Sequence, residues 1–225
     1  MNLRFAMVTV IALSASVISS TRAADWPTFQ YNNARVATSD AVLKAPLKLR
    51  WEYAAPARPE KAWEGPRNTP IEGQIMRHRV KFDDAIQVVI ADGKAYFGSI
   101  VDHHVYCIDA KTGKSIWSFC TEGPVRLAPT VAEGKVYFGS DDGLVYCLNG
   151  TTGETVWKLR PTPRDERLLA RGQMISRWPI RTGVLVDDGV AYFGAGIFPH
   201  ETVYLCAADA KTGKLIWKND SISQQ

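Results

Sequence analysis

The sequence predicts an all-β fold built from repeated four-stranded antiparallel sheets. An eleven-residue motif occurs three times, over Cys107–Trp117, Cys147–Trp157 and Ala207–Trp217. Short runs of alternating apolar and polar residues surround each copy, separated by turn sequences such as Asp92-Gly93. The first two copies are 40 residues apart. A period near 40 with four strands per unit is typical of a β-propeller blade.

Each expected unit begins with a hairpin and ends with the motif. In the first unit, at about residues 86–119, strands are expected over Gln87–Ala91, Lys94–Ser99, Val105–Asp109 and Lys114–Phe119. Asp92-Gly93 joins the first two strands, because glycine tolerates the positive φ of a hairpin turn. The same pattern predicts two further units, at about residues 129–159 and 183–218.

Two long segments interrupt these repeats. Residues 54–84, with four prolines and many charges, and residues 160–181 are expected to be loops or insertions. Before them, Leu47–Tyr53 alternates apolar and polar residues, which predicts a strand. Trp51 holds the place in this strand that Trp117 holds at the end of the first unit. The sequence therefore predicts a partial β-propeller, an open arc of three full blades plus one leading strand.

The first 23 residues have the pattern of a cleaved signal peptide. Arg4 supplies a positive charge, Phe5–Ile18 is mostly apolar, and Thr21-Arg22-Ala23 has small residues where a signal peptidase reads. Cleavage is expected after Ala23 or Ala24. A transmembrane helix needs about 20 apolar residues, and neither this run nor any later one is long enough. The mature chain, residues 24–225, is expected to be exported to the periplasm or the outside, with no membrane span.

Composition and charge exclude few function classes. The hydrophobic fraction of 46% is ordinary for a globular protein, and the formal net charge is +4. No dense run of Lys and Arg alternates with aromatic residues, so nucleic acid is not the expected partner. The expected surface is diffusely positive.

The four cysteines are Cys107, Cys120, Cys147 and Cys206. An oxidising compartment permits disulfides. Cys107 and Cys147 hold equivalent places in neighbouring units, which favours small buried residues over a bridge between them. A Cys107–Cys120 bridge stays open, because the sequence alone does not decide pairing.

Positions one, three, six, seven and eleven of the motif share residue types in all three copies: a small residue, Asp or Asn, Thr, Gly and Trp. These positions are Cys107, Asp109, Thr112, Gly113 and Trp117; Cys147, Asn149, Thr152, Gly153 and Trp157; and Ala207, Asp209, Thr212, Gly213 and Trp217. Asp and Asn at position three are expected to cap a turn. A flat indole needs a small neighbour below and an uncluttered backbone above, and it buries roughly 150–250 Å². The motif thus predicts a structural docking device.

This pattern resembles the pyrroloquinoline quinone (PQQ) repeat of quinoprotein alcohol dehydrogenases and of an outer-membrane assembly scaffold. The resemblance rests on Asp-Gly-x-x-Tyr-Phe-Gly-Ser, Val-Tyr-Cys-Ile-Asp and Thr-Gly-x-x-x-Trp, and covers Leu47–Tyr53 and Ile86–Lys218. It implies that each Trp docks between the small residue of its own blade and the Thr-Gly peptide of the next blade. Trp117 would then dock between Cys107 and Gly153.

The resemblance carries two main functional expectations. The first is an exported binding scaffold, expected to be a fragment of a longer chain. The alternative is the N-terminal part of a PQQ-dependent alcohol or sugar dehydrogenase. A third reading, an assembly module at the outer membrane, is disfavoured because no cysteine at the cleavage site offers a lipid anchor. The substrate or partner stays open.

No catalytic residue or metal ligand is assigned from the sequence. A quinoprotein dehydrogenase holds Ca²⁺ with carboxylate and amide oxygens, uses a catalytic Asp and stacks its quinone. Asp141-Asp142 is read as turn chemistry, and His103-His104 point to opposite sides of an extended chain. PQQ and Ca²⁺ are therefore expected only under the dehydrogenase alternative.

Strand direction places all the long links on one face of the arc. Links between blades, and links from the second to the third strand within a blade, emerge on the same side. Residues 160–181 hold six arginines, and two tryptophans lie in the insertions. Because Trp and Arg are typical of binding hot spots, this face is expected to bind a protein or an anionic ligand. The candidate residues are Trp63, Arg171, Arg177 and Trp178.

Three blades do not close a ring. In related proteins the leading strand completes the final blade, but only residues 218–225 follow Trp217 here. A truncated reading frame or a fragment is the first explanation. The second is a small arc completed by self-association through open blade edges.

Overall fold

The computed structural model describes residues 25–56, 58–60, 85–170, 172–197 and 199–221. The expected signal peptide and most of insertion 54–84 lie outside the described residues. The described chain is all-β, with strands in antiparallel sheets and a short 3₁₀ turn, η1 (Pro199–Glu201), between two of them. No helix in this described part could cross a membrane.

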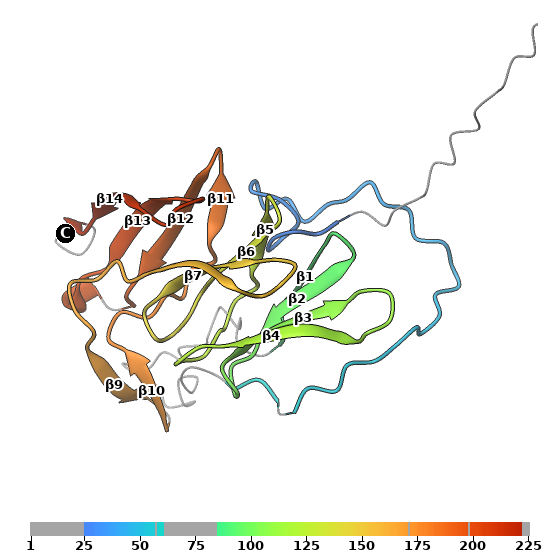
Figure 1. The fold of residues 1–225 in the computed structure, drawn as a ribbon, viewed down its shortest axis with the longest axis horizontal. Coiled ribbons are helices and arrows are strands. Elements are labelled where there is room, and N and C mark those ends of the chain that lie inside the picture. Colours follow the sequence, from blue (N-terminus) through green and yellow to red (C-terminus); the bar gives the residue numbers. More distant parts are fainter. Residues whose placement is uncertain (1–24, 57, 61–84, 171, 198, 222–225) are drawn as a thin grey trace, which may run out of the picture.

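Three four-stranded sheets form the blades, each in the order of its chain (Figure 1). Blade one contains β1 (Val88–Ala91), β2 (Lys94–Gly98), β3 (His104–Asp109) and β4 (Ser115–Cys120). Blade two contains β5 (Thr130–Ala132), β6 (Lys135–Gly139), β7 (Val145–Asn149) and β8 (Thr155–Leu159). Blade three contains β11 (Leu185–Asp187), β12 (Val190–Ala195), β13 (Tyr204–Asp209) and β14 (Leu215–Asn219). The sheets do not close into a ring, so the predicted all-β open arc of blades is confirmed.

The first strand of each blade lies at the centre of the arc. β5 contacts both β1 and β11. Turns close each first hairpin with glycine at positive φ, as at Gly93 (φ 72°) and Gly134 (φ 70°). β3–β4 carries a register shift at Cys107/Ile108, and the other two blades carry one at the equivalent place. The repeated irregularity lets the Asp or Asn turn close while the Trp faces the small residue across the ladder.

The N-terminal segment crosses the three inner strands. Trp26 exchanges two backbone hydrogen bonds with Ile90 of β1 (2.7 and 2.9 Å). Pro27 O accepts from the N–H of Val131 in β5 (2.7 Å), and Asn33 Nδ2 donates to Val186 O of β11 (2.8 Å). The segment therefore covers backbone edges that would otherwise stay open.

The core lies between the blades. One apolar cluster joins blades one and two, and a second joins blades two and three. Tyr96 and Phe138 are among the fully buried side chains of the first cluster, and Tyr137 and Phe193 of the second. A third, smaller cluster joins blade one to the segment that contains Trp51 and Tyr53.

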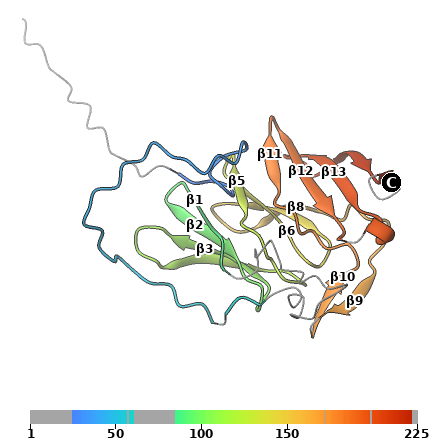
Figure 2. The same ribbon diagram turned by 180° about the vertical axis from the view of Figure 1, so that it is seen from behind.

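Two expectations about the segments between blades need correction. Leu47–Tyr53 is not a strand, because no strand in the described chain pairs with it and it makes no ladder hydrogen bonds there. Residues 160–181 are not a plain loop. They contain a two-stranded hairpin, β9 (Arg167–Ala170) and β10 (Gln173–Ser176), which stands apart from the blades (Figures 1 and 2).

Candidate functional site

The motif tryptophans lie at the junctions between blades. The ring of Trp117 covers Gly153 so closely that a Cβ there would lie 2.8 Å from Cδ2 of the indole. Trp117 Nε1 donates to Gly150 O (3.2 Å), and the hydroxyl of Tyr96 donates to the same carbonyl oxygen (3.1 Å). Across its own ladder Trp117 faces Cys107. One carbonyl of blade two is thus held by two donors of blade one.

The next junction repeats this geometry. Trp157 covers Gly213, where a Cβ would lie 2.6 Å from the indole. Trp157 Nε1 and the Tyr137 hydroxyl each donate to Ala210 O at 3.0 Å. Burial raises the pKa of Tyr137 well above its ordinary value, so this hydroxyl stays a donor at physiological pH.

The segment before blade one docks in the same way. Trp51 covers Gly113 and donates to Ala110 O (3.0 Å). Tyr53 packs edge-on against Phe97, with ring centroids 5.0 Å apart. Leu47–Tyr53 therefore occupies the place of a last blade strand, although the strands that would pair with it are not in the described chain.

The last motif tryptophan has no such neighbour in the described chain. Trp217 is 42% exposed, whereas Trp157 is 7% exposed. Its ring lies near Tyr192, with centroids 6.3 Å apart, in the tilted arrangement that Tyr137 and Trp157 adopt one blade earlier. At the two earlier junctions, a Tyr and a Trp of one blade donate hydrogen bonds to the next blade. Tyr192 and Trp217 are the equivalent pair at the end of blade three.

The motif carboxylates cap turns. Asp109 Oδ1 accepts from the N–H of Thr112 (2.7 Å), the hydroxyl of Thr112 (2.7 Å) and the N–H of Lys111 (3.1 Å). The Thr112 hydroxyl bond is the main cause that lowers the pKa of Asp109. Asp209 makes the same contacts, and Asn149 accepts from the N–H groups of Thr151 and Thr152.

All four cysteines are free thiols. Cys107, Cys147 and Cys206 are buried, and burial raises the pKa of each thiol to about 11. Cys120 is exposed and faces His104 across the ladder, so the Cys107–Cys120 bridge left open by the sequence is absent.

The links do gather on one face. The N–H of Val125 donates to Ser99 O, and the N–H of Asp141 donates to Pro124 O. Ile180 N–H donates to Ser140 O at 3.0 Å. These bonds tie the links between blades to the links within blades. We call this side, together with hairpin β9–β10, the insertion face.

The arginines of the insertion face are paired with carboxylates. Arg177 donates to Glu166 (2.8 Å) and to Glu201, and Arg167 donates to Glu122 and to Asp165 (3.1 Å). Arg160 and Arg164 pair with Asp165 and Glu166. The charges of these four described arginines are therefore largely balanced. A shallow hollow on this face is lined by Glu166, Arg167, Leu168, Arg177 and Glu201.

The sequence-based candidates of this face fall in different places. Trp178 is 5% exposed, donates to Glu201 O (2.6 Å) and belongs to the core between blades two and three, so it does not present its indole to a partner. Arg177 lies 5.4 Å above the ring of Trp178 and is partly exposed. Trp63 and Arg171 lie outside the described residues.

Sequence reasoning missed a buried ion cluster under this face. Asp141, 1% exposed, accepts from Arg126 Nε (2.6 Å) and from Arg181 Nε and Nη2 (both 2.7 Å). Arg126 follows blade one, Asp141 links β6 to β7, and Arg181 precedes blade three. The cluster therefore joins the links of all three blades. An arginine shortly before the first strand of both later blades was the available signal.

An Asp–Tyr pair repeats beside this cluster. The Tyr146 hydroxyl donates to Asp142 Oδ2 (2.6 Å), and the Tyr106 hydroxyl donates to Asp102. Burial raises the pKa of Asp142 and of Tyr146. The spacing of four residues, seen in both blades, was the sequence signal. Asp142 also accepts from the N–H of Leu144 (2.9 Å), which agrees with turn chemistry.

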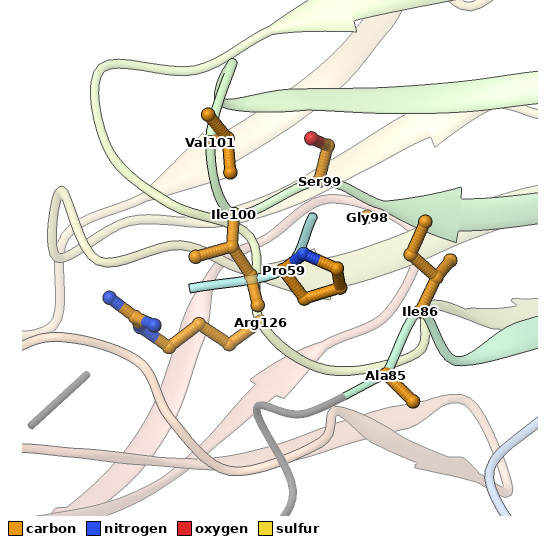
Figure 3. A pocket seen from close by; sticks show the side chains of 8 residues that line it. All are labelled: Pro59, Ala85, Ile86, Gly98, Ser99, Ile100, Val101 and Arg126. Carbon is orange, nitrogen blue, oxygen red and sulfur yellow. The ribbon is translucent and has the colours of Figure 1, made fainter. Parts of the chain in front are cut away.

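A small crevice opens between blade one and the link to blade two (Figure 3). Pro59 lies in it beside Ile86 and Ile100, and Arg126 runs along one side. Arg126 is held by Asp141 and donates to Glu60 O (3.1 Å). The walls are mainly aliphatic, so the crevice offers little for recognition of a large polar ligand.

The sequence of the chain matches a known protein family. The family model described as outer membrane protein assembly factor BamB matches residues 60–225. The chain belongs to this PQQ-repeat family. The predicted resemblance is confirmed.

Several of the proteins that the chain resembles are dehydrogenases. The chain is 37% identical over 125 residues to the dehydrogenase subunit of the quinone alcohol dehydrogenase of Gluconobacter oxydans, covering 49% of this chain and 16% of that protein. A europium-containing methanol dehydrogenase is similar in structure, with TM-score 0.61, 18% identity, 86% of this chain and 31% of that chain.

Another is the quinohemoprotein alcohol dehydrogenase of Comamonas testosteroni, with TM-score 0.55 and 21% identity over 87% of this chain and 27% of that chain. At these identities the structures show the fold alone. The chain spans less than a third of each of these relatives.

The buried acidic side chains of the described residues are already engaged in other bonds. Among the described residues, no three His, Cys, Asp or Glu side chains gather as metal ligands. The most buried carboxylate, Asp141, is already bound by two guanidinium groups, and Asp142 by Tyr146 and backbone N–H groups. A cation at Asp141 would have to compete with the two guanidinium groups that already balance its charge.

Proposed function

We propose that the chain is part of an exported β-propeller scaffold whose insertion face binds another protein. The observation that supports this most is the folded, ion-paired hairpin β9–β10. Arg177 ties it to Glu201 in the link between β12 and β13 of blade three, and Arg167 ties it to Glu122 after blade one. A segment held at both sides loses little entropy when it binds a partner.

The chemistry of the hollow favours a protein over a small anion. Its charged groups alternate in sign, and each arginine already has a carboxylate partner. A protein surface with its own mixture of charges can exchange such pairs, whereas a free anion would meet a carboxylate beside every arginine. The sequence left two partner classes open, a protein and an anionic ligand. Of these two, we propose the protein.

Affinity capture with Arg177→Glu tests the proposal. The tagged chain is recovered from cells that carry its gene, after crosslinking, with Lys111→Glu on the opposite turn as the matched control. Arg177→Glu should lower recovery of one defined partner at least about tenfold, which corresponds to about 1.4 kcal/mol, and Lys111→Glu should not. Equal recovery with both variants contradicts a partner on this face.

The alternative is the N-terminal part of a PQQ-dependent dehydrogenase, and the observation that favours it is the 37% identity to a quinone alcohol dehydrogenase subunit. Titration with PQQ, with and without Ca²⁺, followed by tryptophan fluorescence, separates the two. Calcium-dependent quenching that saturates would support the dehydrogenase. The scaffold proposal expects no saturable change.

A further inference from the structure

The outer edge of β9 is open. β9 pairs with β10 alone, and both views show β9 on the side away from the blades (Figures 1 and 2). Leu169 and Met174 face each other across this hairpin and are 70% and 49% exposed. A two-stranded ribbon with an apolar exposed pair is a site where another strand can add.

The ladder shows which backbone groups of β9 point outward. Arg177 N–H donates to Glu166 O (2.8 Å), which makes Glu166 and Arg177 a hydrogen-bonded pair. Hydrogen-bonded pairs alternate along an antiparallel ladder, so Leu168 bonds Ile175 in the next such pair. Arg167 and Leu169 therefore turn their N–H and C=O groups away from β10. No backbone hydrogen bond to these four groups exists within the described chain.

We propose that this edge pairs with β9 of a second copy of the chain about a twofold axis at Leu168. In that register Arg167 lies opposite Leu169 of the second copy, and the two residues exchange both backbone hydrogen bonds. The axis generates the same pair again, giving about four bonds. Between these two pairs, Leu168 of one copy lies opposite Leu168 of the other copy, as a non-hydrogen-bonded pair. The two hairpins then form one four-stranded sheet in the order β10-β9-β9-β10.

Charge and sequence fit a second copy. Arg167 lies opposite a leucine and not opposite the arginine of the other copy, so like charges do not face each other. Its charge is already balanced by Glu122 and Asp165, and that of Arg177 by Glu166 and Glu201. With the charges of Arg167 and Arg177 already paired, neither side chain opposes the approach of a second hairpin. Because one strand pair buries little area, the dimer should be weak, with a dissociation constant in the micromolar range.

Disulfide trapping tests the register. The full chain carries Cys120→Ser to remove the exposed native thiol, and Leu168→Cys is oxidised under native conditions. Non-hydrogen-bonded partners have Cα atoms about 4.5 Å apart, within the range a disulfide spans. A disulfide-linked dimer should form. Met174→Cys is the control on the same hairpin, with similar exposure but no place at the axis, and it should stay monomeric.

A second variant removes the pairing without unfolding the hairpin. The N–H of Leu169 points outward, so Leu169→Pro removes no bond to β10 and is tolerated at an edge strand. It should abolish trapping at Leu168→Cys and shift sedimentation equilibrium in the micromolar range to monomer, with an unchanged circular dichroism spectrum. A monomer without Leu169→Pro, equal trapping at both cysteines, or a dimer that survives Leu169→Pro overturns the proposal. The last outcome would place the second copy elsewhere, such as on the open side of blade three.

Discussion

Glycine under an indole explains why the motif tolerates no side chain at position seven. Gly134 and Gly153 both have positive φ, at 70° and 76°. A Cβ at Gly134 would meet no atom within 4 Å, whereas one at Gly153 would strike Trp117. An alanine would have an unfavourable positive φ at either position. Only at Gly153 would its Cβ also contact an indole ring.

We expect Gly134→Ala to lower the free energy of unfolding by about 1 kcal/mol, the cost of a left-handed alanine. Gly153→Ala should lower it by about 2–4 kcal/mol, because overpacking adds about 1–3 kcal/mol. Urea denaturation of both variants measures the difference. Equal losses would show that the ring does not rest on this glycine.

The turn carboxylates make stability depend on pH. The folded-state pKa of Asp109 is lowered, chiefly by the Thr112 hydroxyl. A lowered pKa means that the stability is present above the unfolded pKa, about 3.9, and is lost as the pH falls through the folded value. Asn149 performs the same capping in blade two without ionising.

Asp109→Asn should therefore flatten the acid limb of the stability curve below about pH 4, while stability near neutrality changes less. Thermal unfolding of the variant and the native chain between acid and neutral pH checks this. Asn149→Ala is the control, since it removes a cap but no titrating group. An acid limb that Asp109→Asn leaves unchanged would contradict the assignment.

At the scale of elements, the ion cluster fixes how the links meet. Asp141→Ala would leave Arg126 and Arg181 buried without their shared carboxylate. Loss of one member of a buried pair costs about 3–5 kcal/mol. Asp165→Ala, in an exposed pair with Arg160 and Arg167, should cost about 0–1 kcal/mol. Chemical denaturation distinguishes them, and similar small losses would show that the cluster does not hold the links.

Strands were predicted correctly from the sequence where alternating apolar and polar residues also have a neighbouring strand to pair with. The strands of the three blades follow from alternation and glycine turns, and their docking contacts follow from the fixed motif spacing. Leu47–Tyr53 has the alternation of a strand but lacks ladder partners, so only its docking through Trp51 and Tyr53 remains. Hairpin β9–β10 was missed, although Gly172 between two short apolar runs is a turn signal.

The candidate site was less predictable because it depends on distant contacts. Arg126, Asp141 and Arg181 come from three separate links, and although the repeated arginine before β5 and β11 is visible in the sequence, nothing local links it to Asp141. Trp178 looked like a hot spot because Trp and Arg are enriched at interfaces. Its environment is set by β13 and η1, which follow it in the chain, and these bury it.

At the scale of the whole molecule, the first three motif-type tryptophans of the arc are docked on a neighbouring segment and the last one is not. Trp51, Trp117 and Trp157 each cover a glycine and donate to a carbonyl. Trp217 does neither within the described chain and is 42% exposed. If indole docking holds successive blades together, the buried and the open tryptophan must differ in their contribution to stability.

The comparison of Trp157→Ala with Trp217→Ala in urea denaturation tests this most directly. The buried ring should contribute about 3–5 kcal/mol to the free energy of unfolding, and the ring at the open end less than about 1 kcal/mol. Losses of equal size, or a larger loss for Trp217→Ala, would contradict an arc held together by tryptophans clamped between neighbouring sheets.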